Sequence, residues 1–452
     1  MSVPVQKART RRPDLHALRR TGRRYPVEPA HVALCGVVVL AAALRLTHLD
    51  VVEFKLDEVG HLVRALRIIE EHRLPLVGSQ ASVGIAKPPT MSLLMAIPLL
   101  FGRDPRLASG FIALLNVGAV AGCFLVARRY YSLRVAVIAA GLFAANPWAV
   151  VFSRKIFTAD VLAPFLVLYL YALHAAVVDR SACGWLLAPF SLGIMLSITF
   201  SPLPLALVLV VLVIACWRHV RWRYLSAGGG LALLLFVPYL YAQFGHLPGI
   251  ETLLQTMAQP GAAGGPGLNA LEAATWLHSG RNLGALAGAA FDAFTPAHSP
   301  LRALDGLAAL LFVLAIPGVV AMGVEAWRRA DRRTHLSRYA LLSLWLVISL
   351  AIVTLGIVRV QLQYLIILYP VGFLAMALVV DRAWALLATL GRTWLKWTRA
   401  GRLGLGVFLG AIVLWQVCCV FFLHGFVSAH DTTGGYGVPL RPWLAISDMV
   451  RR

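Results

Sequence analysis

The sequence predicts an all-α membrane protein that crosses the bilayer many times. Of its 452 residues, 59% are hydrophobic and 13% are charged, whereas a soluble protein carries about 25% charged residues. Long apolar runs recur along the chain, and most have the length that a helix needs to cross a bilayer. These two observations exclude an ordinary soluble enzyme.

The charge and the cysteines are also typical of a membrane protein. The formal net charge is +21, but no basic soluble domain exists to bind nucleic acid, and Lys and Arg gather in predicted cytoplasmic loops beside lipid head groups. The cysteines lie mostly within or beside apolar runs and lack a Cys-x-x-Cys pair. We therefore expect buried thiols and no disulfide framework, and the six residues are Cys35, Cys123, Cys183, Cys216, Cys418 and Cys419.

The amino end sets the predicted topology. Residues 1–32 form a basic tail that the positive-inside rule keeps in the cytoplasm. The first span, about 33–49, resembles an uncleaved signal anchor. We therefore expect residue 50 onward to lie at the extracytoplasmic face, with Arg45 snorkelling toward water.

A first outer loop, 50–106, should carry two helices that do not cross the membrane. Apolar residues from Val59 to Ile69 recur with a period near 3.6, which predicts an amphipathic interfacial helix over about 57–73. The apolar run 89–101 is too short to span. Pro88 and Pro89 suit the start of a second, interfacial or re-entrant helix there.

The rest of the chain adds ten predicted spans, for a total of about eleven. They lie near 107–127, 133–152, 160–178, 184–200, 202–217, 224–244, 303–324, 339–358, 362–380 and 403–424. This divides the chain into a transmembrane domain, 33–424, and an extracytoplasmic tail, 425–452. Between spans we expect a large outer loop at 245–302, with helical pieces near 269–293, and an amphipathic inner surface helix at 382–402.

The first outer loop carries the residues best suited to chemistry. Asp57 and Glu58 are adjacent, so on a helix they point about 100° apart and one can face a site while the other faces solvent. A carboxylate partly withdrawn from water has a raised pKa and can accept a proton; the alternative is that both simply decorate a helix amino end. His61, one turn on, is either a metal ligand or a residue of the polar face.

Further charged residues lie at the outer ends of predicted spans. Lys87, held extended by the following prolines, suits a phosphate group, or else snorkels. Asp160 suits the cap or first turn of the next span, and Arg154 can pair with it or with a phosphate. Arg359 and Tyr364 are placed to contact an anionic lipid phosphate.

Taken in order, these motifs resemble a known group. Asp57-Glu58 after the first span, Lys87-Pro88-Pro89 before the next, and Arg154 followed six residues later by Asp160 resemble the GT-C membrane glycosyltransferases. Glycosyltransferase family 39 and the lipid A aminoarabinose transferases look most similar, and the protein O-mannosyltransferases are more distant. The resemblance covers most of the chain and is sharpest over residues 30–180.

The resemblance implies a GT-C fold and transfer of a sugar from a polyprenyl-phosphate donor to a lipid, glycan or protein acceptor at the extracytoplasmic face. In it Asp57 matches the catalytic base, Asp160 the second acid, and Glu58 completes the acidic pair. Lys87 matches the lysine that holds the donor phosphate. Arg359 is assigned to the same site from its position in the chain rather than from a motif.

The resemblance requires no cofactor. Ala86 stands where the aminoarabinose enzymes have an acid, so the sequence gives no support for a divalent metal. The implied location is the plasma (inner) membrane, with several spans and a cytoplasmic amino end.

Three other functions fit the composition. A transporter or flippase of a lipid-linked sugar would need polar residues at mid-membrane, whereas the ionisable residues here concentrate at the outer ends of spans. A polymerase or ligase of glycan chains, and a scaffold without activity, stay open.

Overall fold

The protein is helical wherever its structure is described. The computed structural model describes residues 28–80, 86–244, 269–329, 337–355, 361–390 and 395–451. Within these ranges β-pairing is limited to two isolated bridges, Glu53–Pro439 and Gln80–Ala86. The predicted all-α class is confirmed.

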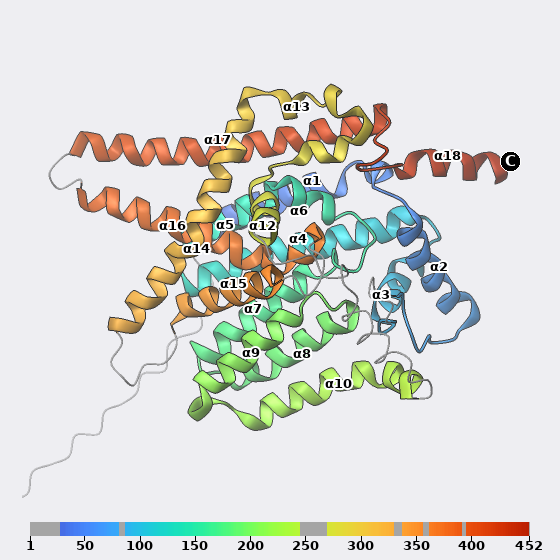
Figure 1. Cartoon of the computed structure of the whole chain (residues 1–452), viewed down its shortest axis with the longest axis horizontal. Helices are drawn as coiled ribbons and strands as arrows, with labels where there is room; N and C mark the ends of the chain where they lie inside the picture. The colour runs from blue at the N-terminus through green and yellow to red at the C-terminus, as the bar shows by residue number, and fades with distance from the viewer. Residues whose placement is uncertain are drawn as a thin grey trace, which may run out of the picture.

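Figure 1 shows the helices, labelled in chain order. The α-helices are α1 (Pro29–Leu46), α2 (Leu56–Glu71), α3 (Thr90–Leu99), α4 (Pro105–Tyr130), α5 (Leu133–Ala145), α6 (Pro147–Phe152), α7 (Ala163–Val177), α8 (Ala182–Ile198), α9 (Leu203–Ala215), α10 (Trp222–Phe244), α12 (Asn269–Ser279), α13 (Thr295–His298), α14 (Ala303–Arg329), α15 (Arg338–Thr354), α16 (Tyr369–Leu390), α17 (Leu395–Ala429) and α18 (Leu440–Arg451). Short 3₁₀ segments are η2 (Leu49–Val51), η3 (Trp217–His219), η4 (Leu283–Ala293), η5 (Pro300–Arg302) and η6 (Leu362–Leu368).

Several helices have the length and composition of membrane spans. In the described ranges six qualify: Pro29–Leu46, Pro105–Tyr130, Trp222–Ala242, Pro300–Arg328, Leu362–Leu387 and Arg399–Ala429. The apolar helices α5, α7, α8, α9 and α15 coincide with the five other predicted spans but are shorter. The multi-pass architecture is therefore confirmed, and the number of eleven spans stays a prediction.

Two predicted segments are divided differently. The run 133–152 is two helices, because Pro147 opens α6 and the Asn146 side chain accepts a hydrogen bond from Ala149 N at 2.9 Å, which caps the new helix. The surface helix expected at 382–402 is wrong as a separate element. Residues 382–390 continue α16, and residues 395–402 already belong to α17.

Close helix packing builds the core around α16. The rings of Phe143 on α5 and Phe373 on α16 stack with centroids 5.2 Å apart. Elsewhere small residues let backbones touch: a Cβ on Gly184 of α8 would lie 2.3 Å from Ala176 N of α7. Such contacts hold the helix ends, and the loops between them, in fixed positions.

Arg45 does not snorkel, so that expectation is wrong. Its side chain is fully buried, and its guanidinium donates to Ala144 O at 2.7 Å and Phe143 O at 3.0 Å. These carbonyls end α5 and lack helical partners of their own. Arg45 therefore caps α5 and ties α1 to the core.

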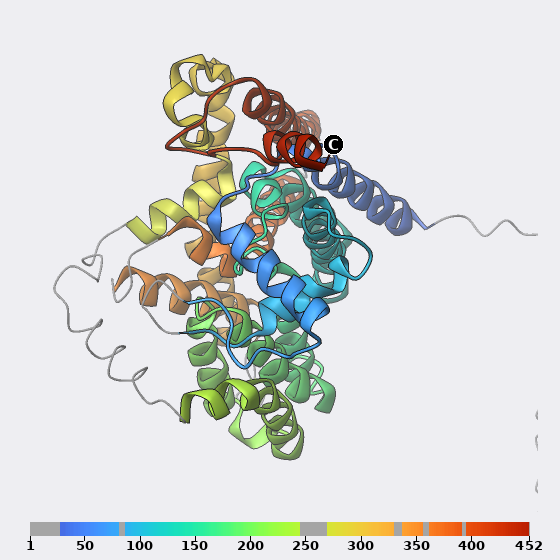
Figure 2. The ribbon, with the colours of Figure 1, turned by 90° about the vertical axis from the view of Figure 1, so that its right-hand side faces the viewer.

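One end of the molecule carries the candidate site, and we call it the α2 face. It comprises α2, α3, the loop 153–162 and the segment 431–439. Figure 2 looks onto this end and shows α2 lying across the ends of the helices behind it. Leu62 and Ala65 of α2 are buried with Met91 and Met95 of α3 in the main core, so the amphipathic helix predicted here is confirmed.

Candidate active site on the α2 face

The backbone around Lys87 is held by a short antiparallel contact. Gly78 N donates to Lys87 O at 2.7 Å, and Lys87 N donates to Ser79 O at 2.9 Å. Pro89 then precedes α3, whose first residue is Thr90. The lysine backbone is therefore fixed on both sides.

The Lys87 side chain points into the protein. It is 9% exposed, and its Nζ donates to Thr158 Oγ1 at 3.4 Å. Burial lowers the pKa of the ammonium below 10.5, the nearby Asp57 carboxylate opposes this shift, and Arg64 adds to it. Lys87 thus joins the first outer loop to the loop 153–162, and no carboxylate forms an ion pair with it among the described residues.

The amino end of α2 separates its two acids, as the helical geometry predicts. Glu58 is fully buried and accepts a hydrogen bond from Lys55 N at 2.9 Å, which caps the helix. Asp57 is exposed. Of the two carboxylates, Asp57 is therefore free to receive a proton from an arriving substrate.

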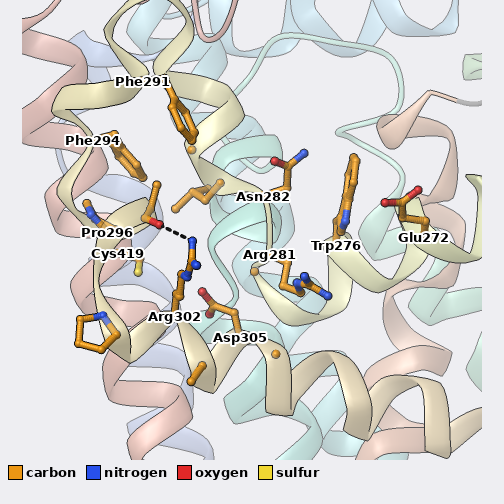
Figure 3. Close-up of a pocket in the computed structure, with 17 residues that line it drawn as sticks. Glu272, Trp276, Arg281, Asn282, Phe291, Phe294, Pro296, Arg302, Asp305 and Cys419 are labelled. Carbon is orange, nitrogen blue, oxygen red and sulfur yellow. Dashed lines mark hydrogen bonds between the residues drawn. The ribbon is translucent and has the colours of Figure 1, made fainter.

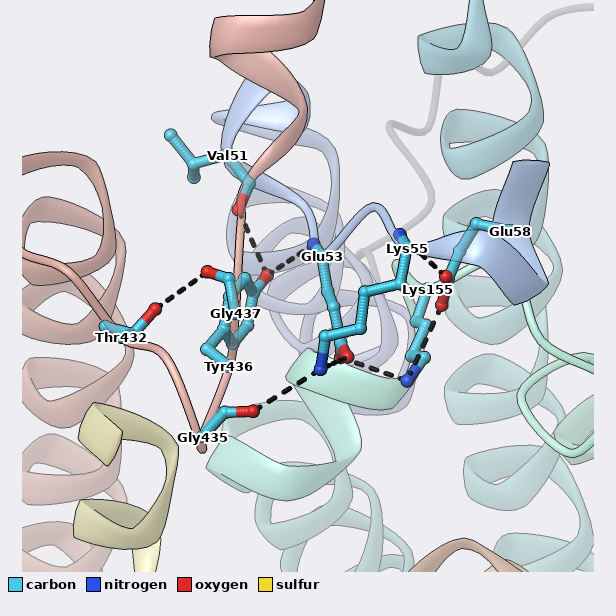
Figure 4. A network of polar contacts seen from close by, with 9 residues as sticks. All are labelled: Val51, Glu53, Lys55, Glu58, Lys155, Thr432, Gly435, Tyr436 and Gly437. Atoms are coloured by element: carbon cyan, nitrogen blue, oxygen red, sulfur yellow. Dashed lines mark hydrogen bonds and ion pairs between the residues drawn. The ribbon is translucent and has the colours of Figure 1, made fainter. Parts of the chain in front are cut away.

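A buried ion network surrounds Glu58 (Figure 4). Lys155 Nζ lies 3.0 Å from Glu53 Oε2 and 3.5 Å from Glu58 Oε1. Burial raises the pKa of Glu58 while Lys155 opposes the shift. For Lys155 itself burial lowers the pKa, but Glu53, Glu58 and Asp160 outweigh it, so the ammonium stays charged. Lys155 thus acts on three acids from two segments, and Lys55 also pairs with Glu53 at 2.5 Å.

Asp160 is buried without a hydrogen bond to its carboxylate. Its side chain is 1% exposed, and neither carboxylate oxygen has a partner within the described residues. Its backbone O accepts a hydrogen bond from Asn116 Nδ2 at 2.9 Å, which fixes the loop. α7 begins only at Ala163, so the expectation that Asp160 caps this helix is wrong. A buried acid without a partner is costly, and such groups concentrate at functional sites.

His61 completes the inner wall of the site. It is 3% exposed, and its ring meets the edge of Phe157 with centroids 6.4 Å apart. Burial, with Arg64 and Lys87, lowers the pKa of His61 to about 4. The imidazole is therefore neutral at pH 7 and contributes shape and hydrogen bonding rather than charge.

The three remaining predicted site residues are Arg154, Tyr364 and Arg359. Arg154 is buried, and its guanidinium contacts the His424 ring and His48 O, so it does not pair with Asp160. Burial lowers the pKa of Arg154. Tyr364 is half-buried in η6. Arg359 lies outside the described residues.

The segment 431–439 covers one side of the site. The Tyr436 hydroxyl donates to Val51 O and accepts from Glu53 N, both at 3.0 Å. Gly437 approaches so closely that a Cβ there would lie 2.4 Å from Lys55 Cε. Gly437 therefore permits the close approach of two chain segments (Figure 4).

Sequence reasoning missed Glu53, Lys155 and Tyr436. The Ser153-Arg154-Lys155 run carried a signal, since adjacent side chains in a turn point in different directions. Only one of the two cations could then face the acids, and the sequence alone did not show which. No group of three or more His, Cys, Asp or Glu suited to a metal occurs in the part of the chain that the structure describes.

The carboxyl of Asp160 should make stability depend on pH. Its raised pKa means that the folded state keeps a proton where the unfolded chain has released it. This stabilisation is complete below the ordinary pKa of Asp and is lost as pH rises through the raised value. Asn is neutral throughout, so Asp160→Asn should raise the midpoint of thermal unfolding at pH 8 by about 2 °C or more and change it less at pH 5.

The measurement is thermal unfolding of detergent-solubilised protein followed by intrinsic fluorescence. The exposed Asp448 provides a matched control, since Asp448→Asn should shift neither midpoint. An equal shift of the Asp160→Asn midpoint at both pH values would show that its effect is steric rather than electrostatic.

Gly78 is expected to be essential for placing Lys87. A Cβ on Gly78 would lie 2.5 Å from Pro88 O, which is backbone and cannot turn aside. Gly78→Ala should therefore displace Lys87 and lower the activity of the site about tenfold, since small misplacements of binding groups are costly. Gly118→Ala is the control, because a Cβ there meets nothing within 4 Å; loss in both variants would contradict the prediction.

Comparisons with known proteins agree with this architecture. Residues 86–241 match the sequence model of the dolichyl-phosphate-mannose-protein mannosyltransferases. This match includes Lys87 and the loop 153–162 but spans less than half of the chain. No curated protein matches the sequence.

Solved structures extend the likeness to most of the chain. ArnT from Cupriavidus metallidurans bound to undecaprenyl phosphate superposes with a TM-score of 0.58 at 14% identity, over 89% of this chain and 77% of that chain. The apo form of ArnT gives 0.59 at 14% identity, over 90% and 78%. At this identity the likeness shows the fold: the chain is a multi-pass membrane protein with the GT-C fold, as its motifs predicted.

Proposed function

We propose that this GT-C protein is a glycosyltransferase that moves a sugar from a polyprenyl-phosphate donor to an acceptor lipid, glycan or protein. The match over residues 86–241 is to a family of glycosyltransferases, and a solved structure of the same fold holds undecaprenyl phosphate. Both support a lipid-linked donor.

The observation that carries the proposal is the meeting of three segments on the α2 face. Lys87 contacts Thr158, the Asp57 carboxylate acts on the Lys87 ammonium, and Lys155 lies within electrostatic reach of Asp160. A cation for a phosphate, an accessible carboxylate and a second acid thus lie together in a chain whose spans offer an apolar surface to a lipid tail.

The proposed reaction is a single inverting displacement. Asp57 accepts the proton of the acceptor hydroxyl while the hydroxyl oxygen attacks the anomeric carbon. The bond between that carbon and the phosphate oxygen breaks, and its electron pair leaves with the polyprenyl phosphate. Lys87 stabilises the charge that develops on this leaving phosphate.

Asp160 acts as the second acid of the site. Its raised pKa favours the neutral form, which has one O–H to donate. Lys155 pairs with Glu53 at 3.0 Å and with Glu58 at 3.5 Å, and so holds both side chains in place beside the site. Arg154 supports the neighbouring loop rather than the phosphate, because it contacts His48 and His424.

We place the α2 face on the extracytoplasmic side of the plasma (inner) membrane, with the amino end in the cytoplasm. Basic side chains support this orientation because they gather at the opposite helix ends. There Arg129 pairs with Asp179, Arg134 with Asp381, and Arg382 with Glu325. An excess of Lys and Arg at one end is the mark of a cytoplasmic surface.

The test separates transfer from transport. Purified protein in liposomes is given a polyprenyl-phosphate sugar and a mixture of envelope glycolipid acceptors, and free polyprenyl phosphate is measured by mass spectrometry. A transferase cleaves the donor only when an acceptor is present. A flippase moves the intact donor between leaflets, so movement without cleavage would refute the proposal.

A further inference from the structure

A cavity of about 600 Å³ lies away from the candidate active site. It opens between the segment 272–306 and α17, and Figure 3 shows its lining. The volume falls within the range of about 300–1,000 Å³ that small-molecule sites occupy. None of the residues that line it belongs to the cluster around Lys87 and Asp160.

The cavity combines aromatic rings with a few polar groups. Phe291 and Phe294 form one side and Trp276 the other, while Asn282 lies between them (Figure 3). Asp305 lies in the middle, where its Oδ1 accepts the indole N–H of Trp415 at 3.0 Å. Its second carboxylate oxygen has no hydrogen-bond partner among the described residues, so it can accept from a ligand hydroxyl.

Two guanidinium groups add positive charge to this lining. Arg302 is oriented by a hydrogen bond from its guanidinium to Ala297 O at 3.0 Å. Arg281 lies close enough to Asp305 to act on that carboxyl electrostatically. Neither arginine forms an ion pair with a carboxylate within the described residues, although Glu272 also lines the cavity. Both can therefore bind an anion, which a planar guanidinium does with two parallel hydrogen bonds.

The walls are built to hold this shape. Gly284 allows close packing, since a Cβ there would lie 2.7 Å from the Phe291 ring. Gly280 has a φ of +81°, which side chains rarely adopt, and packs on Pro147. The Trp148 indole donates to Arg281 O at 2.9 Å. The cavity is thus anchored on α6, the short helix that leads into the loop 153–162.

We infer that this cavity is a second ligand site, separate from the reaction centre, and that it binds a saccharide carrying a phosphate or carboxylate. The aromatic rings supply apolar surface for a sugar ring, Asn282 and Asp305 bond its hydroxyls, and Arg281 and Arg302 bind its anionic group. The site holds a sugar unit other than the one transferred.

The experiment measures binding to full-length protein in phosphatidylcholine nanodiscs by saturation-transfer difference NMR. Glucose 6-phosphate is the probe, with glucose and inorganic phosphate as comparisons. We expect saturation of the sugar ring protons, and an affinity about tenfold lower in Arg281→Gln and in Arg302→Gln, because each removes a charge-assisted hydrogen bond. Trp276→Ala should weaken binding of glucose and glucose 6-phosphate alike. The exposed Arg103→Gln is the matched control.

The outcomes separate this inference from the proposed catalysis. Binding should persist in Asp57→Asn; its loss there would assign the signal to the reaction centre and overturn a second site. Absence of saturable binding, or unchanged binding in the Arg281→Gln and Arg302→Gln double variant, would overturn the inference. If inorganic phosphate competes as strongly as glucose 6-phosphate, the cavity binds an anion without recognising the sugar. This result also overturns the inference.

Discussion

Replacing Asp57 by Asn should slow sugar transfer by about 10²–10⁴-fold, the usual contribution of a general base. Asn keeps the size of the side chain but cannot take a proton from the acceptor. Asp57 is exposed on the α2 face, unlike its neighbour Glu58, whose oxygens face Lys55 N and Lys155. Binding of the donor lipid should change little, because the cation proposed to hold its phosphate is Lys87.

The two effects are measured separately. Transfer is followed as release of polyprenyl phosphate by purified protein, and donor binding by retention of the labelled lipid on the same preparation. Glu70→Gln is the matched control, since Glu70 is an exposed acid near the other end of α2 that pairs with Arg103. Full activity in Asp57→Asn would remove this residue from the mechanism.

The elements that the sequence predicted best are those set by local polarity. Apolar runs marked the helices because a helix in lipid must be apolar over its whole length, and the apolar run 89–101 was too short to span. The extracytoplasmic side of the site is a prediction from the same pattern. Lys87 lies within electrostatic reach of Asp57 and contacts Thr158 in the loop that carries Asp160, because these segments leave the bundle at one end.

The sequence could not predict the direction in which an individual side chain points. Arg154 and Lys155 are adjacent and both basic, yet packing sends the first toward His424 and the second toward Glu53. Arg45 had the position of a snorkelling residue but found the open carbonyls of α5.

Contacts between segments that are far apart in the chain could not be predicted either. The contact of Tyr436 with Val51 and Glu53 joins residues more than 380 positions apart. The cavity beside α6 likewise needs residues from α12 to α17 brought together. No local sequence pattern predicts such contacts, because they depend on the packing of every helix between the two segments.

Replacing Lys87 by Gln should lower sugar transfer by about 10²–10³-fold, the cost of removing one preorganised group that stabilises charge in a transition state. The loss should come partly from weaker donor binding, since the same ammonium meets the phosphate before and after the bond breaks. Lys87 suits this task because it is 9% exposed, fixed by Gly78 and Ser79, and not neutralised by an ion pair within the described residues.

The lowered pKa of Lys87 adds a second signature. Burial shifts the pKa of the ammonium below 10.5, so as pH rises the charge, and with it donor affinity, is lost earlier than for an ordinary lysine. We expect donor binding to fall on the alkaline side in the wild type and to be weak and nearly independent of pH in Lys87→Gln. Lys55→Gln is the control, because the Lys55 ammonium is neutralised by Glu53 at 2.5 Å and donates to Gly435 O, whereas Lys87 has no ion pair within the described residues. Equal losses in both variants would contradict this prediction. They would show that the donor phosphate responds to the total positive charge of the α2 face rather than to Lys87 in particular.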